Sequence, residues 1–183
     1  MKISTIILSF ILITQLGFSQ RKTTFPLVNA AAKGDLGKVK SYVKKGEDIN
    51  QKNRARWTAL AYAIKFDHFD VVKYLIENGA DINETVNTGE TPLQIALKNG
   101  KYNIAKYLVS KKADVNKADI MKMSPFAWAV KDANMEKVKF LIENGANVNQ
   151  QNISGRTPLD MCDNFKIKKY LISKGAKTSQ DLL

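Results

Sequence analysis

The sequence has very few of the residues on which most enzyme and metal sites depend. It contains one cysteine, Cys162, and one histidine, His68. A single cysteine excludes a disulfide within the chain and a zinc site built from cysteines. A lone histidine nearly excludes a catalytic or metal-binding group based on that residue. The chain also lacks a glycine-rich phosphate-binding loop, and Ser124 and Thr91 have no neighbouring histidine to activate them. We therefore predict no enzymatic activity, no cofactor and no bound metal.

Acidic residues are also scarce relative to basic ones. The 183 residues include 29 Lys or Arg and 17 Asp or Glu, for a formal net charge of +12. The hydrophobic content of 44% and the charged content of 25% are typical of a globular protein. The positive charge favours an acidic partner, an anionic surface or simple solubility, and it carries no information about the fold.

The hydrophobic stretch at the N-terminus, residues 3–13, is shorter than the roughly 20 apolar residues that span a bilayer. It follows the basic start Met1-Lys2 and precedes small residues that end at Ser19. This pattern predicts a bacterial signal peptide, residues 1–19, cleaved after Ser19. We expect a periplasmic or secreted mature chain without a transmembrane segment. An uncleaved anchor or a buried leading helix is the alternative, and a lipoprotein anchor is excluded because no cysteine follows the stretch.

One short motif recurs along the chain at a spacing of 33 residues. Its clearest copy is Thr91-Pro92-Leu93, followed by Ala96. The equivalent segments are Phe25-Pro26-Leu27, Thr58-Ala59-Leu60, Ser124-Pro125-Phe126 and Thr157-Pro158-Leu159. Self-similarity at a period of 20 to 50 residues is the signature of a repeat protein.

Each period predicts two helices and a turn. In the third copy, Thr91 is placed to cap a helix that Pro92 begins, because proline needs no N–H at the first helical position. A second helix is expected over residues 102–110, with apolar positions on several sides. Glycine ends this helix at Gly46, Gly79 and Gly145, where a positive φ is needed. The third copy has Lys112 there, which should cost on the order of 1 kcal/mol.

This combination of motifs resembles the ankyrin repeat. The Thr-Pro-Leu-x-x-Ala motif, the Gly-Ala turn and the Asp-Val/Ile-Asn exit all fit that family over about residues 22–183. The resemblance implies an all-α solenoid of about five stacked helix-turn-helix repeats with short β-hairpin-like fingers. The domain would cover residues 20–183, with repeats at about 21–53, 54–86, 87–119, 120–152 and 153–183.

The chain departs from the family pattern in three ways. The family's histidine after Thr-Pro-Leu is replaced by Val28, Ala61, Gln94, Ala127 and Asp160, of which Gln94 and Asp160 are able to substitute for its hydrogen bonds. The last repeat is three residues shorter, so we expect a shortened first helix before Phe165. Of the two singly occurring residues, His68 is interpreted as a polar helix-start residue and Cys162 as a small buried one.

The resemblance implies partner binding through the fingers and the exposed side of the first helices, which form the concave face. The candidate residues there are Arg54, Arg56, Trp57, Lys65, Phe66, Glu90, Lys98, Ile120, Met121, Met123, Lys131 and Arg156. Apolar and Arg side chains at finger positions are typical of protein interfaces. Trp57 and Met123 have the alternative of folding back onto a neighbouring repeat. Tyr62 and Trp128 are expected to pack between repeats.

A row of lysines should lie on the outer side of the second helices. It comprises Lys40, Lys73, Lys106, Lys139 and Lys169. This convex lysine row is either a solvated face or a contact for an anionic surface.

Taken together, these features predict an exported, monomeric module that binds a protein with an acidic surface and does not bind nucleic acid. The alternatives are an immunity or inhibitor protein that neutralises a toxin or enzyme in the periplasm, and a basic module that associates with an anionic envelope surface.

Overall fold

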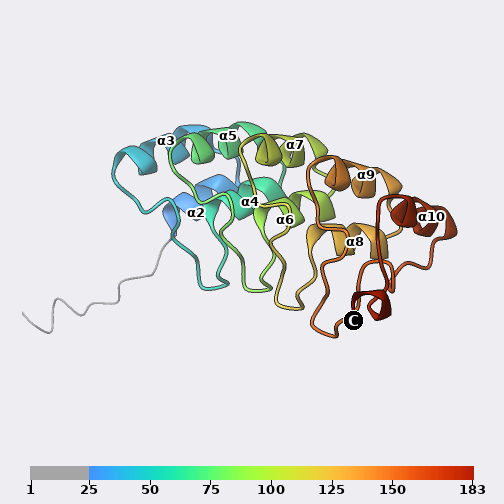
Figure 1. Ribbon diagram of the computed structural model, residues 1–183. Helices are drawn as coiled ribbons and strands as arrows, with labels where there is room; N and C mark the ends of the chain where they lie inside the picture. The colour runs from blue at the N-terminus through green and yellow to red at the C-terminus, as the bar shows by residue number, and fades with distance from the viewer. Residues whose placement is uncertain (1–24) are drawn as a thin grey trace, which may run out of the picture.

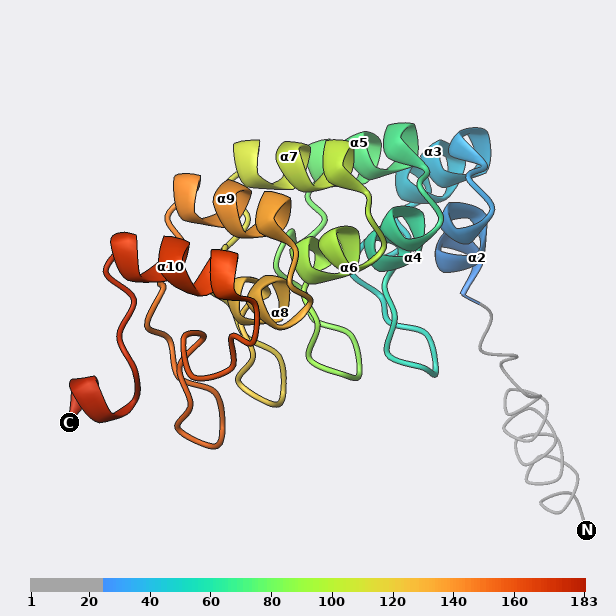
Figure 2. The same cartoon turned by 90° about the vertical axis from the view of Figure 1, so that its right-hand side faces the viewer.

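The computed structural model describes residues 25–183, so the predicted signal peptide lies outside the described residues. The helices form two layers in an arched stack, with loops projecting from one edge as fingers (Figures 1 and 2). The first helix of each repeat is α2 (Pro26–Ala32), α4 (Ala59–Lys65), α6 (Pro92–Lys98) or α8 (Pro125–Lys131). The second is α3 (Leu36–Lys44), α5 (Phe69–Glu77), α7 (Tyr102–Ser110), α9 (Met135–Glu143) or α10 (Phe165–Ser173). The prediction of an all-α repeat solenoid is confirmed.

Side-chain caps define where α4, α6 and α8 begin. The hydroxyls of Thr58, Thr91 and Ser124 each accept a hydrogen bond from the backbone N–H three residues later, at 3.1, 3.2 and 3.1 Å. All three side chains are buried, so the hydroxyl satisfies a helix N–H that water does not reach. The repeated motif is therefore a structural unit.

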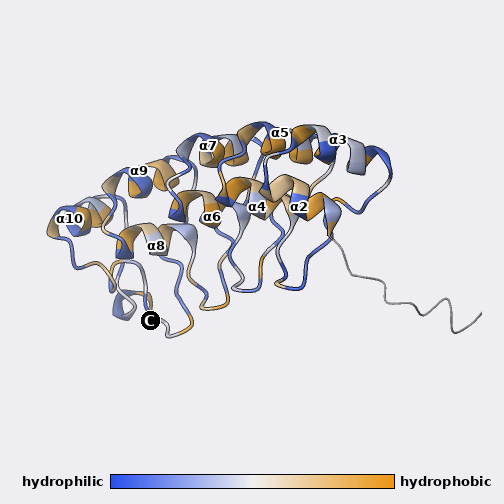
Figure 3. Cartoon of the chain, turned by 180° about the vertical axis from the view of Figure 1, so that it is seen from behind, coloured by the Kyte–Doolittle hydropathy of each residue, from blue (hydrophilic) through white to orange (hydrophobic). Residues whose placement is uncertain are grey.

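The hydrophobic core lies between the two layers and runs through the stack. Four fully buried residues one period apart, Val39, Val72, Ala105 and Val138, contribute from the second helices. Figure 3 shows hydrophobic residues concentrated in the helices, with mostly hydrophilic turns and loops between them. Each repeat thus buries its apolar faces mainly against its neighbours, as solenoid repeats do. None of the helices described here is long and apolar enough to cross a membrane.

An asparagine ladder also links consecutive repeats. The side-chain oxygens of Asn50, Asn83, Asn116 and Asn149 accept hydrogen bonds from the backbone N–H of the next repeat, at 2.7–2.9 Å. The predicted Asp-Val/Ile-Asn exit therefore holds one repeat to the next.

The fingers, at residues 54–57, 87–90, 120–123 and 153–156, are narrow turns, and each is numbered by its repeat, from the second to the fifth. Each is closed by a backbone hydrogen bond across its base, such as Asn53 N–H to Trp57 O at 3.0 Å and Asp119 N–H to Met123 O at 3.1 Å. Within residues 25–183 no strand is assigned, so the fingers are hairpin-like in path only. Ile153 N–H donates to Met121 O at 3.0 Å, which joins the fourth finger to the fifth.

The last repeat lacks a first helix. Residues 158–161 form a turn where α2, α4, α6 and α8 have their counterparts. The shortening expected before Phe165 is confirmed, and the three missing residues reduce the helix to this turn. The Asp160 carboxylate accepts hydrogen bonds from Thr157 N–H at 2.8 Å and Ser179 N–H at 3.0 Å. The final segment, which ends in a 3₁₀ turn (Gln180–Leu182), is thus tied to the last repeat.

Candidate functional site

The concave face is formed by the first helices and the fingers, which lie on the same side of the stack (Figure 1). Of the twelve residues predicted to bind a partner, nine are exposed, Trp57 and Glu90 are half-buried, and Met123 is buried. The exposed ones are Arg54, Arg56, Lys65, Phe66, Lys98, Ile120, Met121, Lys131 and Arg156. The surface therefore combines basic side chains with apolar ones, of which Ile120 is 66%, Met121 51% and Phe66 49% exposed.

The prediction that Met123 is an exposed finger residue is wrong. Its side chain is only 5% exposed. The backbone explains this, because the Asp119 carboxylate accepts hydrogen bonds from both Met121 N–H and Met123 N–H and folds the finger sharply between them. Met121 thereby points outward, while Met123 turns back toward the helices, as the alternative interpretation had it.

In the second repeat the concave surface is an aromatic row. The Trp57 and Tyr62 rings are 5.0 Å apart, and the Tyr62 and Phe66 rings stack at 6.1 Å. The Lys65 ammonium lies 5.0 Å from the centre of the Trp57 ring. A lysine above an aromatic face is attracted by the ring and keeps its charge at the surface. This part of the face presents flat apolar area together with positive charge.

In the fourth repeat Trp128 is the central side chain, a role that sequence reasoning missed. Its indole Nε1 donates to the Asp119 carboxylate at 2.7 Å, and the Lys131 ammonium lies 5.0 Å from its ring. Trp128 is half-buried, so its ring borders the surface. The available signal was the polar residue nine positions earlier, since Asn53 also bonds to the aromatic residue nine positions later, although there its Nδ2 donates to the Tyr62 hydroxyl at 3.3 Å.

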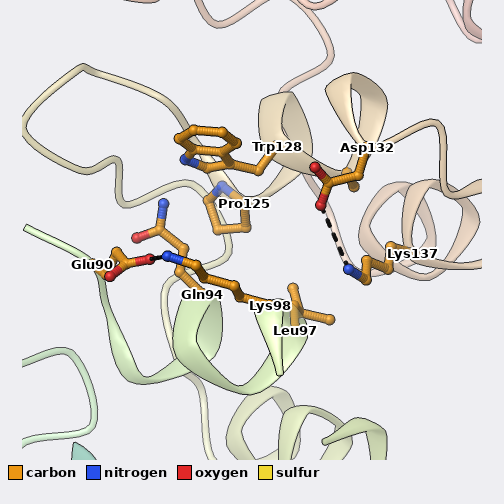
Figure 4. A pocket seen from close by; sticks show the side chains of 9 residues that line it. Glu90, Gln94, Leu97, Lys98, Pro125, Trp128, Asp132 and Lys137 are labelled. Atoms are coloured by element: carbon orange, nitrogen blue, oxygen red, sulfur yellow. Dashed lines mark hydrogen bonds and ion pairs between the residues drawn. The ribbon is translucent and has the colours of Figure 1, made fainter. Parts of the chain in front are cut away.

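Between α6 and α8 the concave face has a cleft of about 120 Å³. Figure 4 shows Trp128, Pro125 and Leu97 lining it, with an ion pair on either side. Lys98 pairs with Glu90 at 2.8 Å, and Lys137 pairs with Asp132 at 3.7 Å.

The carboxylates of this cleft are already neutralised by lysines. Burial raises the pKa of Glu90, but hydrogen bonds from Lys98 and Thr88 outweigh it, and the net pKa lies below the ordinary value. Glu90 is therefore charged and paired at neutral pH, and it leaves the surrounding basic residues to set the sign of the surface.

Gln94 takes the place of the family's histidine, as the sequence suggested. Its side-chain oxygen accepts from Thr91 N–H at 2.9 Å, and its Nε2 donates to Met123 O of the next repeat at 2.9 Å. Asp160 substitutes in its own repeat through Thr157 and Ser179. The buried Ala61 and Ala127 occupy the same position in their repeats, and their methyl side chains form no hydrogen bonds.

The convex lysine row lies where it was expected, on the second helices. The Lys40 ammonium lies 5.7 Å from the Tyr74 ring of the next repeat, and Lys139 lies 6.0 Å from the Tyr170 ring. Lys73 pairs with Asp70 at 2.9 Å. Three of the five lysines are thus engaged by neighbouring rings or carboxylates, which gives the row a role in the stack itself.

The two residues with catalytic potential have structural contacts. His68 immediately precedes α5, and its Nε2 lies 3.1 Å from Ala32 O of the preceding repeat. Cys162 is buried, and burial raises the pKa of its thiol, which disfavours the reactive thiolate. Among residues 25–183 no three His, Cys, Asp or Glu side chains are grouped to hold a metal.

The fold and its surface define a helical-repeat solenoid with a mixed apolar and basic concave face. A family model of ankyrin repeats in three copies matches residues 27–119, and a second ankyrin-repeat model matches residues 126–172. The chain belongs to the ankyrin repeat family.

A curated relative supports the assignment over a shorter length. The human Ankyrin repeat domain-containing protein 39 is 44% identical over 46 residues. The alignment spans a quarter of this chain and a quarter of that protein. Ankyrin repeats are generally protein–protein interaction modules, and the family is typically non-catalytic.

Proposed function

We propose that this chain is an exported, monomeric, non-catalytic module that binds another protein through its concave face. The supporting observation is the set of exposed apolar side chains Phe66, Ile120 and Met121, which lie among basic residues on one face. Ile120 and Met121 are adjacent in the chain, and exposed apolar patches rimmed by polar residues mark interaction sites.

The partner should present an acidic surface. Lys65 and Lys131 hold their charges over aromatic rings, and Glu90 is already paired with Lys98. Complementary charge would speed association and select against basic partners. Export, proposed from residues 1–19, would place the encounter in the periplasm or outside the cell.

The same experiments distinguish two other functions. An immunity or inhibitor protein would use the same face, and its captured partner would be a toxin or enzyme that loses activity on binding. Association with an anionic envelope surface would use the convex lysine row, and it is less favoured because Lys40, Lys73 and Lys139 are engaged by neighbouring side chains.

The test begins with capture of partners by the purified chain from the periplasmic fraction of the source organism. The affinity of a purified partner is then measured for the wild type and for Phe66→Ser/Ile120→Ser/Met121→Ser. These side chains are exposed, so the fold should survive their replacement. Binding should weaken about 100-fold, because truncated interface anchors each cost more than about 1 kcal/mol.

The matched control is Phe165→Ser/Ile172→Ser, which removes apolar side chains that are 79% and 57% exposed on α10. Binding should change less than about threefold, since rim or remote residues contribute little. The proposal would be contradicted if the α10 variant lost the partner. It would also be contradicted if binding depended on the convex lysine row and weakened steeply with salt.

A further inference from the structure

A second hollow in the concave face lies between the fourth and fifth fingers. It has a volume of about 300 Å³. Its lining includes three of the five methionines in the sequence, Met121, Met123 and Met161, together with one side of Trp128. The backbone bond from Ile153 N–H to Met121 O holds the two fingers together beside it.

The hollow is built around Asn152. Its side-chain oxygen accepts from Ser154 N–H and Arg156 N–H, at 2.9 and 3.1 Å, which fixes the amide in the finger. Its Nδ2 points at two methionine sulfurs, Met161 at 3.3 Å and Met123 at 3.8 Å. The fixed amide of Asn152 thus holds the flexible side chains of Met123 and Met161 at one wall of the hollow.

The lining is mixed, with an apolar wall formed by the methionines and Trp128 beside polar and charged side chains, so it suits an apolar group that is flanked by charged ones. Methionine side chains are flexible and polarisable, and they adapt to inserted groups, aromatic ones in particular. Trp128 adds a rigid aromatic wall. Although thioethers also bind soft metal ions, a bound cation is disfavoured, because the positive Lys131 and Arg156 line the same hollow and outnumber Asp163.

The charges at the hollow define what should flank the apolar group. The Lys131 ammonium lies over the Trp128 ring, and the Arg156 guanidinium donates one hydrogen bond to Asp160 O at 2.6 Å. Arginine has five N–H donors, so the others remain to bind carboxylates. A carboxylate beside the inserted group would be attracted by both.

We infer that this hollow is an anchor site for a bulky apolar side chain, such as phenylalanine, from an acidic segment of the partner protein. The inference rests on the proposed function, because it specifies what the concave face contacts. Met121 and the methionines behind it would surround the apolar side chain, while Lys131 and Arg156 would bind the neighbouring carboxylates.

The test uses the whole chain with ¹³C-labelled methionine methyl groups and four capped pentapeptide probes. The first has phenylalanine between two pairs of glutamates, the second has alanine in place of phenylalanine, and the third has lysines in place of the glutamates. The fourth replaces the glutamates by glutamines. Methyl resonances of Met121, Met123 and Met161 report the hollow, and Met135 on α9 is the internal control.

The first peptide should shift the three hollow methyl resonances and leave Met135 unchanged. The other three should bind at least about fivefold more weakly. The inference is overturned if no hollow methyl shifts, if Met135 shifts equally, or if the alanine, lysine or glutamine peptide binds as well as the first.

A pair of variants tests the charges. Lys131→Gln/Arg156→Gln should weaken the first peptide about three- to tenfold, since each exposed ion pair contributes up to about 1 kcal/mol. Lys106→Gln/Lys139→Gln, on the convex face, should leave its affinity unchanged. Equal effects of the two variants would overturn the inference, and the methyl spectrum without peptide shows that each variant is folded.

This test can fail separately from the proposed function. If the peptides do not bind but Phe66→Ser/Ile120→Ser/Met121→Ser still loses the captured partner, the anchor site is wrong and the concave binding face remains. If the peptide enters the hollow but that triple variant keeps the partner, the proposed function is wrong.

Discussion

The third repeat, residues 87–119, and the fourth, residues 120–152, begin their first helices 33 residues apart, yet they differ at positions in the finger and on the concave side. The finger of the third repeat turns at Gly89; the buried Val86 immediately precedes this repeat, and the buried Ile95 lies in α6. The residues 33 positions later are Lys122, Asp119 and Trp128.

The two repeats also differ in backbone conformation at two positions. Gly89 and Gly100 adopt positive φ without cost, whereas Lys122 and Ala133 hold φ of 53° and 52° at the same two positions. The second repeat shows the same substitution, with Arg56 at 60° and Asp67 at 65°. Left-handed strain tends to persist where function requires the side chain. Repeats two and four, which also carry Phe66, Ile120 and Met121, are therefore where we expect binding.

The largest effect on stability is expected from Gly89→Ala. The new Cβ would lie 2.6 Å from Ile120 N, so it would push the fourth finger away, and the left-handed backbone would be strained as well. We expect a loss of about 2–4 kcal/mol, measured by urea unfolding. The control Gly155→Ala has a similar φ and no atom within 4 Å of the new Cβ, so it should lose only about 1–2 kcal/mol. Equal losses would show that the contact between fingers contributes nothing.

Gln94→Ala would make the third repeat resemble its neighbours, which have alanine at this position. It removes the bond to Thr91 N–H and the bond to Met123 O, and a buried donor left unpaired costs about 1–3 kcal/mol. Calorimetric unfolding would measure the loss. Conversely, Ala127→Gln should raise stability by about 0.5–1 kcal/mol if it forms the same bonds. A destabilised Ala127→Gln would indicate that the fourth repeat has no room for them.

Arg56→Gly and Lys122→Gly should each stabilise the chain by about 1 kcal/mol, because glycine relieves the left-handed strain. If these fingertips contact an acidic partner, each change should also weaken binding about two- to fivefold. The control is Lys112→Gly, which relieves a φ of 70° at the exit of α7 and should stabilise equally without affecting affinity. An equal loss of binding in the control would show that the loss does not come from the fingertip side chains.

A smaller effect distinguishes Gln94 from Asp160, which hold the same position in different repeats. Burial raises the pKa of Asp160, but hydrogen bonds from Thr157 and Ser179 outweigh it, and the net pKa is lowered. A lowered folded-state pKa stabilises the chain above the unfolded pKa, about 3.9, and this contribution is lost as pH falls through the folded value. The stability difference between wild type and Asp160→Asn should therefore narrow below about pH 4. The cost of Gln94→Ala should stay constant there, and a parallel change would rule out Asp160 as the titrating group.

Most of the fold was predictable because it depends on local signals repeated at a fixed spacing. Thr91 and Pro92 predict where α6 begins, and the period then places the other first helices. The three-residue deficit predicted a shortened helix before Phe165, but not that Asp160 would bond to Ser179. Asp160 and Ser179 do not recur at the 33-residue spacing, so the repeat pattern gives no signal for their contact.

The candidate site was less predictable because exposure at a fingertip depends on the path of the backbone within a few residues. Met121 and Met123 belong to the same finger, and only the bonds to Asp119 decide which of them is exposed. The position of Trp128, one residue after Ala127 in the repeat, predicts that its ring packs between repeats. Its hydrogen bond to Asp119 leaves the ring at the surface between two hollows, which sequence alone did not indicate.

The central claim, that the concave face binds a protein, can be tested directly by photo-crosslinking in the source organism. A photoreactive phenylalanine analogue would replace either Lys98 at the end of α6 or Lys106 on the convex side of α7. Both side chains are exposed and belong to the same repeat, so the two positions compare faces and not repeats. We predict a discrete protein adduct from position 98 and none from position 106. An adduct from position 106 alone, or from neither position, would contradict the claim.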